Sequence, residues 1–154
     1  MNGGPAHRPA VERASPGDAA ALARLAREAL PEPWSEAGFA AELAAPPARV
    51  WVVRGPAGAP LAYLAAQRIL DELHVVSLAV RAPSRRRGLG RALLEHALAA
   101  EPALAAAHLE VRANDADAQA FYRRLGFVPV GRRPGFYPGG IDAVLMTRSV
   151  TPAR

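Results

Sequence analysis

The chain has 154 residues, a formal net charge of +5 and a hydrophobic content of 51%. These values exclude a disordered chain and are expected for one folded domain with a sizeable core. The absence of cysteine excludes disulfides, thiolate metal sites and a cysteine nucleophile.

Hydropathy and amino-acid composition limit the cellular location and the binding partners that we expect. No apolar run reaches the roughly 18 residues of a membrane span, and the first residues lack the apolar core of a signal peptide. We therefore expect a cytoplasmic protein without a membrane partner. All basic residues are arginine, and a basic surface suits an anionic ligand. Aromatic residues make up only 6%, which argues against a platform for single-stranded RNA, so we expect no direct nucleic-acid binding.

The first half of the chain predicts two helices and four strands. We expect residues 1–9 to be a flexible tail and residues 10–149 to be a single domain, followed by a tail at 150–154. Ser15-Pro16-Gly17-Asp18 is a typical helix start, and Ser35 is a second N-cap. Helices are expected from these caps to about Leu30 and to Leu43, and strands at residues 10–13, 49–54, 61–69 and 74–80.

The second half predicts two further helices and three strands. One helix follows the strand at 74–80 and runs to about residue 100. Residues 107–112 alternate between apolar and polar side chains, as in a half-buried strand. A helix begins at Asn114-Asp115 and ends at Gly126. Strands are expected at 127–130 and 141–147, with a loop at 131–140. This order predicts a mixed α/β (α+β) domain.

A turn rich in arginine and glycine, within Val80 to Ala92, organises this pattern. An apolar run before it suits a strand buried on both faces, and the helix after it presents free N–H groups at its start. Such a turn binds anions, because glycines let a phosphate approach the backbone. The turn lacks the third glycine of a dinucleotide site and the lysine of a Walker loop. The alternative is a solvated basic turn that opens a helix.

The spacing Arg-x-x-Gly-x-Gly in this turn resembles the pyrophosphate loop of the GCN5-related N-acetyltransferases (GNAT). Other matching segments extend the resemblance over most of the chain. They are Pro33-Trp34-Ser35, Leu70-Asp71-Glu72, Leu78-Ala79-Val80, Arg86 to His96, Leu109 to Ala113, Phe121 to Phe127 and Phe136-Tyr137-Pro138. The resemblance implies the GNAT fold. That fold has a mixed, mostly antiparallel sheet of six to seven strands, about four flanking helices and a splayed cofactor cleft between the central strands.

The resemblance also implies acetyl-CoA as co-substrate, without a metal. It implies Glu110 as general base and Tyr122 as general acid. From the residues alone, Glu110 is the more common solvated strand glutamate and Tyr122 is a core residue of its helix. His108 is interpreted as structural. No two histidines have metal-ligand spacing. The cofactor-binding residues that the resemblance implies are Leu78, Ala79, Val80, Arg85, Arg86, Arg87, Gly88, Leu89, Gly90, Arg91 and Asp115. Asp115 stands where the family usually has asparagine.

Within the family, the chain is similar to bacterial enzymes that acetylate the N-terminal alanine of a small-subunit ribosomal protein. The chemistry favours a terminal amine, because its pKa is about 8 and that of lysine is about 10.4. We expect Trp34, Glu72 and Tyr137 to contact the substrate, a ribosomal protein as partner, and a monomer or weak dimer. The alternatives are acetylation of lysines or small amines, a non-catalytic acyl-CoA-binding module and a basic RNA-associated protein.

Overall fold

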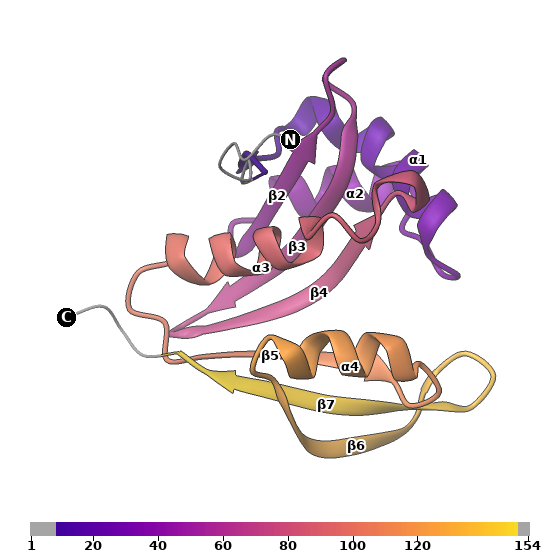
Figure 1. The fold of residues 1–154 in the computed structure, drawn as a ribbon, viewed down its shortest axis with the longest axis vertical. Coiled ribbons are helices and arrows are strands. Elements are labelled where there is room, and N and C mark those ends of the chain that lie inside the picture. Colours follow the sequence, from indigo (N-terminus) through magenta and orange to yellow (C-terminus); the bar gives the residue numbers. More distant parts are fainter. Residues whose placement is uncertain (1–8, 151–154) are drawn as a thin grey trace, which may run out of the picture. The chain divides into compact units, whose positions relative to one another are not determined.

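The computed structural model describes residues 9–150, and within them it has seven strands and four α-helices. The strand order is β1-β2-β3-β4-β5-β7-β6 (Figure 1), which confirms the predicted mixed α/β sheet. The strands are β1 (Val11–Arg13), β2 (Ala48–Arg54), β3 (Pro60–Ile69), β4 (Glu72–Val80), β5 (Ala106–Arg112), β6 (Val128–Tyr137) and β7 (Ile141–Ser149). The helices are α1 (Ala19–Ala29), α2 (Glu36–Ala44), α3 (Leu89–Ala100) and α4 (Ala116–Arg124).

The described residues group into two compact units, each treated separately below. Unit one comprises residues 9–45, Val50–Leu64 and Leu78–Ala97. Unit two comprises Pro46–Arg49, Ala65–Ser77 and residues 98–150. The expectation of a single domain over 10–149 stays a prediction, and the expected tails lie almost entirely outside the described residues.

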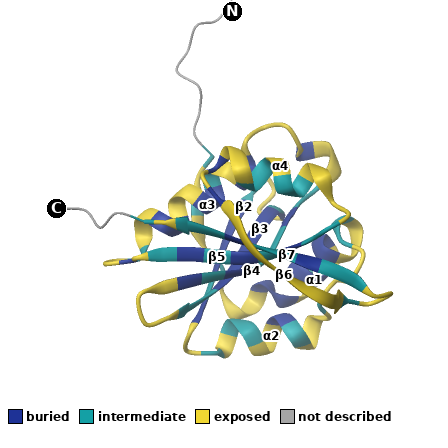
Figure 2. Cartoon of the chain, turned by 90° about the horizontal axis from the view of Figure 1, so that it is seen from below, coloured by how far each residue is buried: buried dark blue, intermediate teal, exposed yellow. Residues whose placement is uncertain are grey.

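In unit one, α1 and α2 lie on one side of the strands and α3 lies on the other (Figures 1 and 2). The predicted start of the first helix is confirmed, although its first turn is the 3-10 helix Pro16–Asp18 and α1 follows directly. Large apolar side chains from helices and strands fill the space between these layers. Those with less than 2% exposure include Leu22, Phe39, Trp51, Val52, Tyr63, Leu64, Leu93 and Leu94.

In unit two, β4 pairs with β5 in parallel, and β7 pairs antiparallel with both β5 and β6. The β4–β5 register runs from Glu72 opposite Ala106 to Val75 opposite Leu109, and the splayed cleft stays a prediction. Helix α4 lies over β5 and β7 (Figure 1). It ends at Arg124, two residues before the predicted stop at Gly126. The Gly126 N–H donates to the Arg123 carbonyl and the Phe127 N–H donates to the Tyr122 carbonyl.

Strand β6 corrects the predicted loop at residues 131–140. The strand continues through Tyr137, which is paired with Ile141, and only the turn from Pro138 to Gly140 remains. The register with β7 shifts between Pro129 and Gly131 and again between Arg133 and Tyr137. These irregularities accommodate residues that look like a loop in the sequence. Nearly the whole strand is exposed (Figure 2).

Strand β4 also differs from its prediction as a strand buried on both faces. Leu73, Val75 and Ala79 are buried, but Leu78 and Val80 are only partly buried. The buried positions alternate along the strand because successive side chains point to opposite faces. Among the described residues, no helix is long and apolar enough to cross a membrane.

The most enclosed charged pair of unit one joins Asp18 to Arg54. The Arg54 Nη1 and Nη2 atoms donate to Asp18 Oδ1 and Oδ2 at 2.9 and 2.8 Å, and the Ser15 N–H donates to Oδ2 at 2.8 Å. Asp18 is buried. The hydrogen bond from Arg54 holds the pKa of Asp18 below its ordinary value against the opposing effect of burial. The carboxylate therefore fixes the start of α1 to β2.

We expect Asp18→Asn to lower the free energy of unfolding at pH 7 by about 2 kcal/mol, the scale of hydrogen bonds to a charged group. Because folding lowers this pKa, the stabilisation is present above the unfolded value of about 3.9 and is lost as pH falls through the folded value. Urea unfolding at pH 7 and at lower pH measures both effects. Glu12→Gln removes the exposed acidic partner of Arg54 and is the control, expected to change stability by less than about 1 kcal/mol.

Candidate functional site

The turn between β4 and α3 in unit one has the geometry of an anion site. Arg86 and Gly88 adopt φ values of +66° and +75°. Apart from Gly88 and its two chain neighbours, no residue has a heavy atom within 4 Å of where a Gly88 Cβ would stand. Residues 85–88 are exposed. The N–H groups at the start of α3 have no intrahelical partner and point toward this turn. A phosphate can therefore approach the backbone at Gly88 with arginines on both sides.

Two of the arginines at this turn have contacts of their own. The Arg85 Nε donates to the Val80 carbonyl at 3.2 Å, which ties the turn to the end of β4. Arg91 pairs with Glu95 one helical turn along, at 3.2 Å. Because the Arg91–Glu95 pair is exposed, it contributes little stability.

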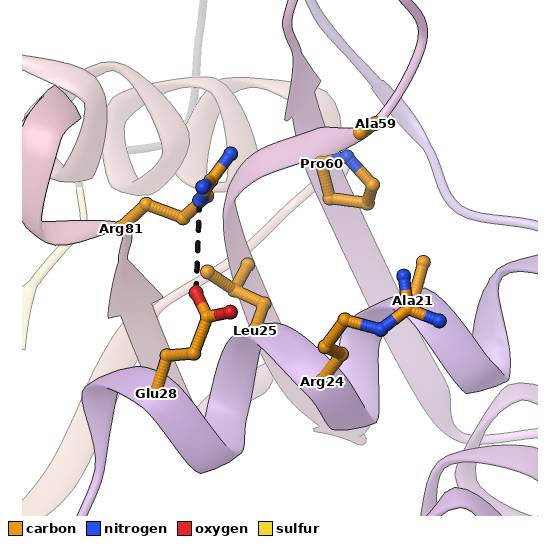
Figure 3. Close-up of a pocket in the computed structure, with 7 residues that line it drawn as sticks. All are labelled: Ala21, Arg24, Leu25, Glu28, Ala59, Pro60 and Arg81. Carbon is orange, nitrogen blue, oxygen red and sulfur yellow. Dashed lines mark ion pairs between the residues drawn. The ribbon is translucent and has the colours of Figure 1, made fainter.

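A pocket elsewhere in unit one lies beside α1 (Figure 3). The Arg81 Nε lies 3.7 Å from Glu28 Oε2 across it. The lining residues are Ala21, Arg24, Leu25, Glu28, Ala59, Pro60 and Arg81. None of the predicted site residues is among them, so this pocket is distinct from the turn.

In unit two, the pairing of β4 with β5 places Glu110 beside His74. His74 is directly opposite His108, and Glu110, two residues further along β5, faces the same side. The His74 Nε2 lies 2.7 Å from Glu110 Oε2 and 3.1 Å from Oε1. The two side chains are 25% and 16% exposed. The Glu110 carboxylate is therefore fixed by a hydrogen bond with His74 and is not freely solvated.

The surroundings of Glu110 keep it ionised. The hydrogen bond with His74 is the largest effect and lowers the pKa of Glu110; burial opposes it, and the charges of His74, Arg133 and His108 add to the lowering. His74 and Arg133 were not singled out from the sequence. Arg133 was assigned to a loop, and its charge acts on Glu110 only through the fold. His74 lies far from Glu110 in the chain, so only strand pairing could reveal their contact.

The structure also brings His74 and His108 together. Their rings stack with centroids 4.8 Å apart and planes 13° from parallel. The separation of the two residues along the chain gave no sign of this contact, and the expectation of no metal stays a prediction.

Tyr122 projects from α4 in unit two. Burial raises the pKa of its phenol, and the nearby Tyr137 and Asp115 raise it further. The ring contacts Phe121 and Phe127 with centroids 5.0 and 5.8 Å away. The phenol therefore keeps its proton at neutral pH, and it lies near Tyr137.

The predicted substrate residues have different settings. Tyr137 ends β6 and is half-buried, with the Arg112 guanidinium 4.8 Å from its ring centroid. Glu72 is exposed at the start of β4, opposite Ala106. Because Glu110 lies four residues along β5 from Ala106, Glu72 is about 13 Å away along the strands, so the structure does not bring these two carboxylates together.

Trp34, in unit one, has a structural role. It precedes the N-cap Ser35 and packs against Phe39, with ring centroids 5.2 Å apart. This is the hydrophobic staple of a helix start. The ring is still partly exposed, and its contact with substrate stays a prediction.

Asp115 caps α4. Its Oδ1 accepts a hydrogen bond from the Ala118 N–H at 3.0 Å, as expected for aspartate at an N-cap. A cap explains this acidic residue without a cofactor contact, and the contact itself stays a prediction.

The comparison with protein families decides the class of the protein. The model of the acetyltransferase (GNAT) family matches residues 19–127. The chain belongs to the GNAT family. It is an N-acetyltransferase.

Individual GNAT proteins agree with this assignment. The ribosomal protein bS18-alanine N-acetyltransferase of Escherichia coli strain K12 is 36% identical over 124 residues, covering 77% of this chain and 82% of that protein. The crystal structure of the Escherichia coli ribosomal-protein-S18-alanine N-acetyltransferase superposes with a TM-score of 0.86 at 32% identity, covering 94% of this chain and 96% of that one. Ard1 from Thermoplasma volcanium gives 0.83 at 26%, covering 94% and 99%.

Proposed function

We propose that this GNAT enzyme transfers the acetyl group of acetyl-CoA to a protein N-terminal amine, the N-terminal alanine of a small-subunit ribosomal protein. The observation that carries the proposal is the similarity to the bS18-alanine N-acetyltransferase of Escherichia coli, which extends over most of both chains. The settings of Glu110 and Tyr122 support it, because each suits one half of the reaction.

The turn before α3 fits the pyrophosphate of acetyl-CoA. Gly88 leaves open space where a side chain would stand, and the arginines from Arg85 to Arg91 supply positive charge. In this assignment the backbone of Leu78 to Val80 pairs with the pantetheine arm. Acetyl-CoA supplies an activated thioester, and the protein orients it.

Glu110 acts as general base for the substrate amine. Its lowered pKa makes it an anion at neutral pH, able to attract an ammonium group and accept its proton directly or through water. A weak base of this kind favours an α-amine over lysine, because deprotonating the α-amine requires roughly 3 kcal/mol less. Loss of the proton gives a neutral amine that attacks the thioester carbonyl.

Tyr122 assists the leaving sulfur. A phenol whose pKa burial has raised is a weaker acid than a thiol, whose ordinary pKa is about 8.5. Tyr122 therefore stabilises the departing thiolate by donating a hydrogen bond. The proton that the amine loses neutralises the negative charge of the departing thiolate.

We expect Gly88→Asp to abolish measurable acetyl-CoA binding, because the new charge would face the pyrophosphate. Gly88→Asn is the matched control, since both residues tolerate the left-handed conformation at this position. Isothermal titration calorimetry compares the two variants. Equal affinity in both would show that the pyrophosphate does not approach Gly88.

We expect Tyr122→Phe to reduce turnover by about 10²-fold, because it removes the hydrogen bond to the leaving sulfur. Acetyl-CoA affinity should remain close to that of the unchanged protein. Single-turnover kinetics and calorimetry measure the two quantities. Unchanged turnover would make Tyr122 a packing residue only.

The proposed substrate class is tested with two peptides of one sequence beginning with alanine. One has a free N-terminus and an acetylated lysine, and the other has an acetylated N-terminus and a free lysine. We expect the first to react faster at neutral pH, with the acetylated position located by mass spectrometry. Faster reaction of the second would establish the lysine alternative, and reaction of neither would favour the non-catalytic acyl-CoA-binding module.

A further inference from the structure

Three groups able to bind a metal converge on one face of the β4–β5 pair in unit two. The ligand atoms of His74, His108 and Glu110 all lie within 4.8 Å of one another. The backbone fixes this arrangement, because His74 is paired with His108 and Glu110 follows on the same face. All three residues are partly exposed, so an ion from solvent can reach them.

The distances need only a small adjustment for a tetrahedral ion. With metal–ligand bonds of about 2.0–2.1 Å, neighbouring ligand atoms lie about 3.3 Å apart. The contacts of 2.7 and 3.1 Å between His74 and Glu110 are already near that value. The partly exposed His108 ring supplies the rest by moving about 1.5 Å toward them, which brings ligand atoms within 4.8 Å to the tetrahedral separation.

The chemical types of these three ligands determine which metal ion they prefer. Two imidazoles and a carboxylate suit Zn²⁺ and similar transition metals, whereas Mg²⁺ and Ca²⁺ prefer oxygen ligands alone. Three protein ligands leave the fourth position open. The positive charge of Arg133, which acts on Glu110 from β6, weakens the binding of a cation and limits the affinity.

We propose that His74, His108 and Glu110 form a binding site for a divalent transition-metal cation and that the bound cation inhibits acetyl transfer. The ion replaces the hydrogen bond between His74 and Glu110 and occupies the carboxylate. The inhibition rests on the proposed function, because it assumes that Glu110 must accept a proton from the amine. The binding does not rest on it.

Binding is tested on the full chain with Co²⁺, followed by its visible absorption, and with Zn²⁺ as competitor. We expect one equivalent to bind with the intense bands of tetrahedral Co²⁺ and Zn²⁺ to displace it. His108→Phe keeps a ring beside His74 but removes a ligand, and should weaken binding at least about 10-fold. His96→Phe, at an exposed position of α3 in unit one, is the control and should bind as the unchanged protein does.

The absence of a saturable one-to-one complex, or equal affinity in His108→Phe, would overturn the site. The second measurement is Zn²⁺ inhibition of peptide acetylation, expressed relative to the metal-free rate of each variant. We expect inhibition of the unchanged protein at concentrations that leave His108→Phe at least about 10-fold less sensitive. Cobalt binding without inhibition of an active enzyme would overturn the inhibitory role. An enzyme inactive without metal would instead contradict the proposed function, with the binding data unaffected.

Discussion

His74 and Glu110 meet because β4 and β5 run in parallel with His74 opposite His108. That register sets three properties of unit two at once. It lowers the pKa of Glu110, stacks the two imidazoles and aligns the ligand atoms on one face. If the β4–β5 register shifted by one residue, the side chains of Glu110 and His74 would lie on opposite faces of the sheet. The chemistry of the carboxylate therefore depends on backbone pairing more than on any single side-chain contact.

The elements with local signals could be predicted from the sequence. Ser15 and Ser35 mark the starts of helices, and Gly126 marks an end, because caps and left-handed positions depend on a few neighbouring residues. Strand β6 could not be predicted in full. Its segment from Gly131 to Tyr137 contains glycine and proline, which favour turns, and its strand structure comes from pairing with distant β7.

The residues of the candidate site also differ in whether local sequence signals could predict them. The exposed turn around Gly88 could be predicted, because its geometry depends on a contiguous run of glycine and arginine. Glu110 could be chosen only through a family resemblance, since a strand glutamate is most often solvated. His74 and Arg133 could not be connected with Glu110, because the His74 contact comes from strand pairing and the charge of Arg133 reaches Glu110 only through the fold. Trp34 shows the reverse case, in which a residue read as a substrate contact has a local packing role with Phe39.

Strand β6 is the last strand in the sheet order, so it is an edge strand. An exposed edge strand is a template onto which another chain can add. The prolines at positions 129 and 134 donate no backbone hydrogen bond, and the register shifts in β6 interrupt its regular pleat. Arg132 and Arg133 add like charges that repel a second copy. The edge is therefore protected against amyloid-like addition of strands.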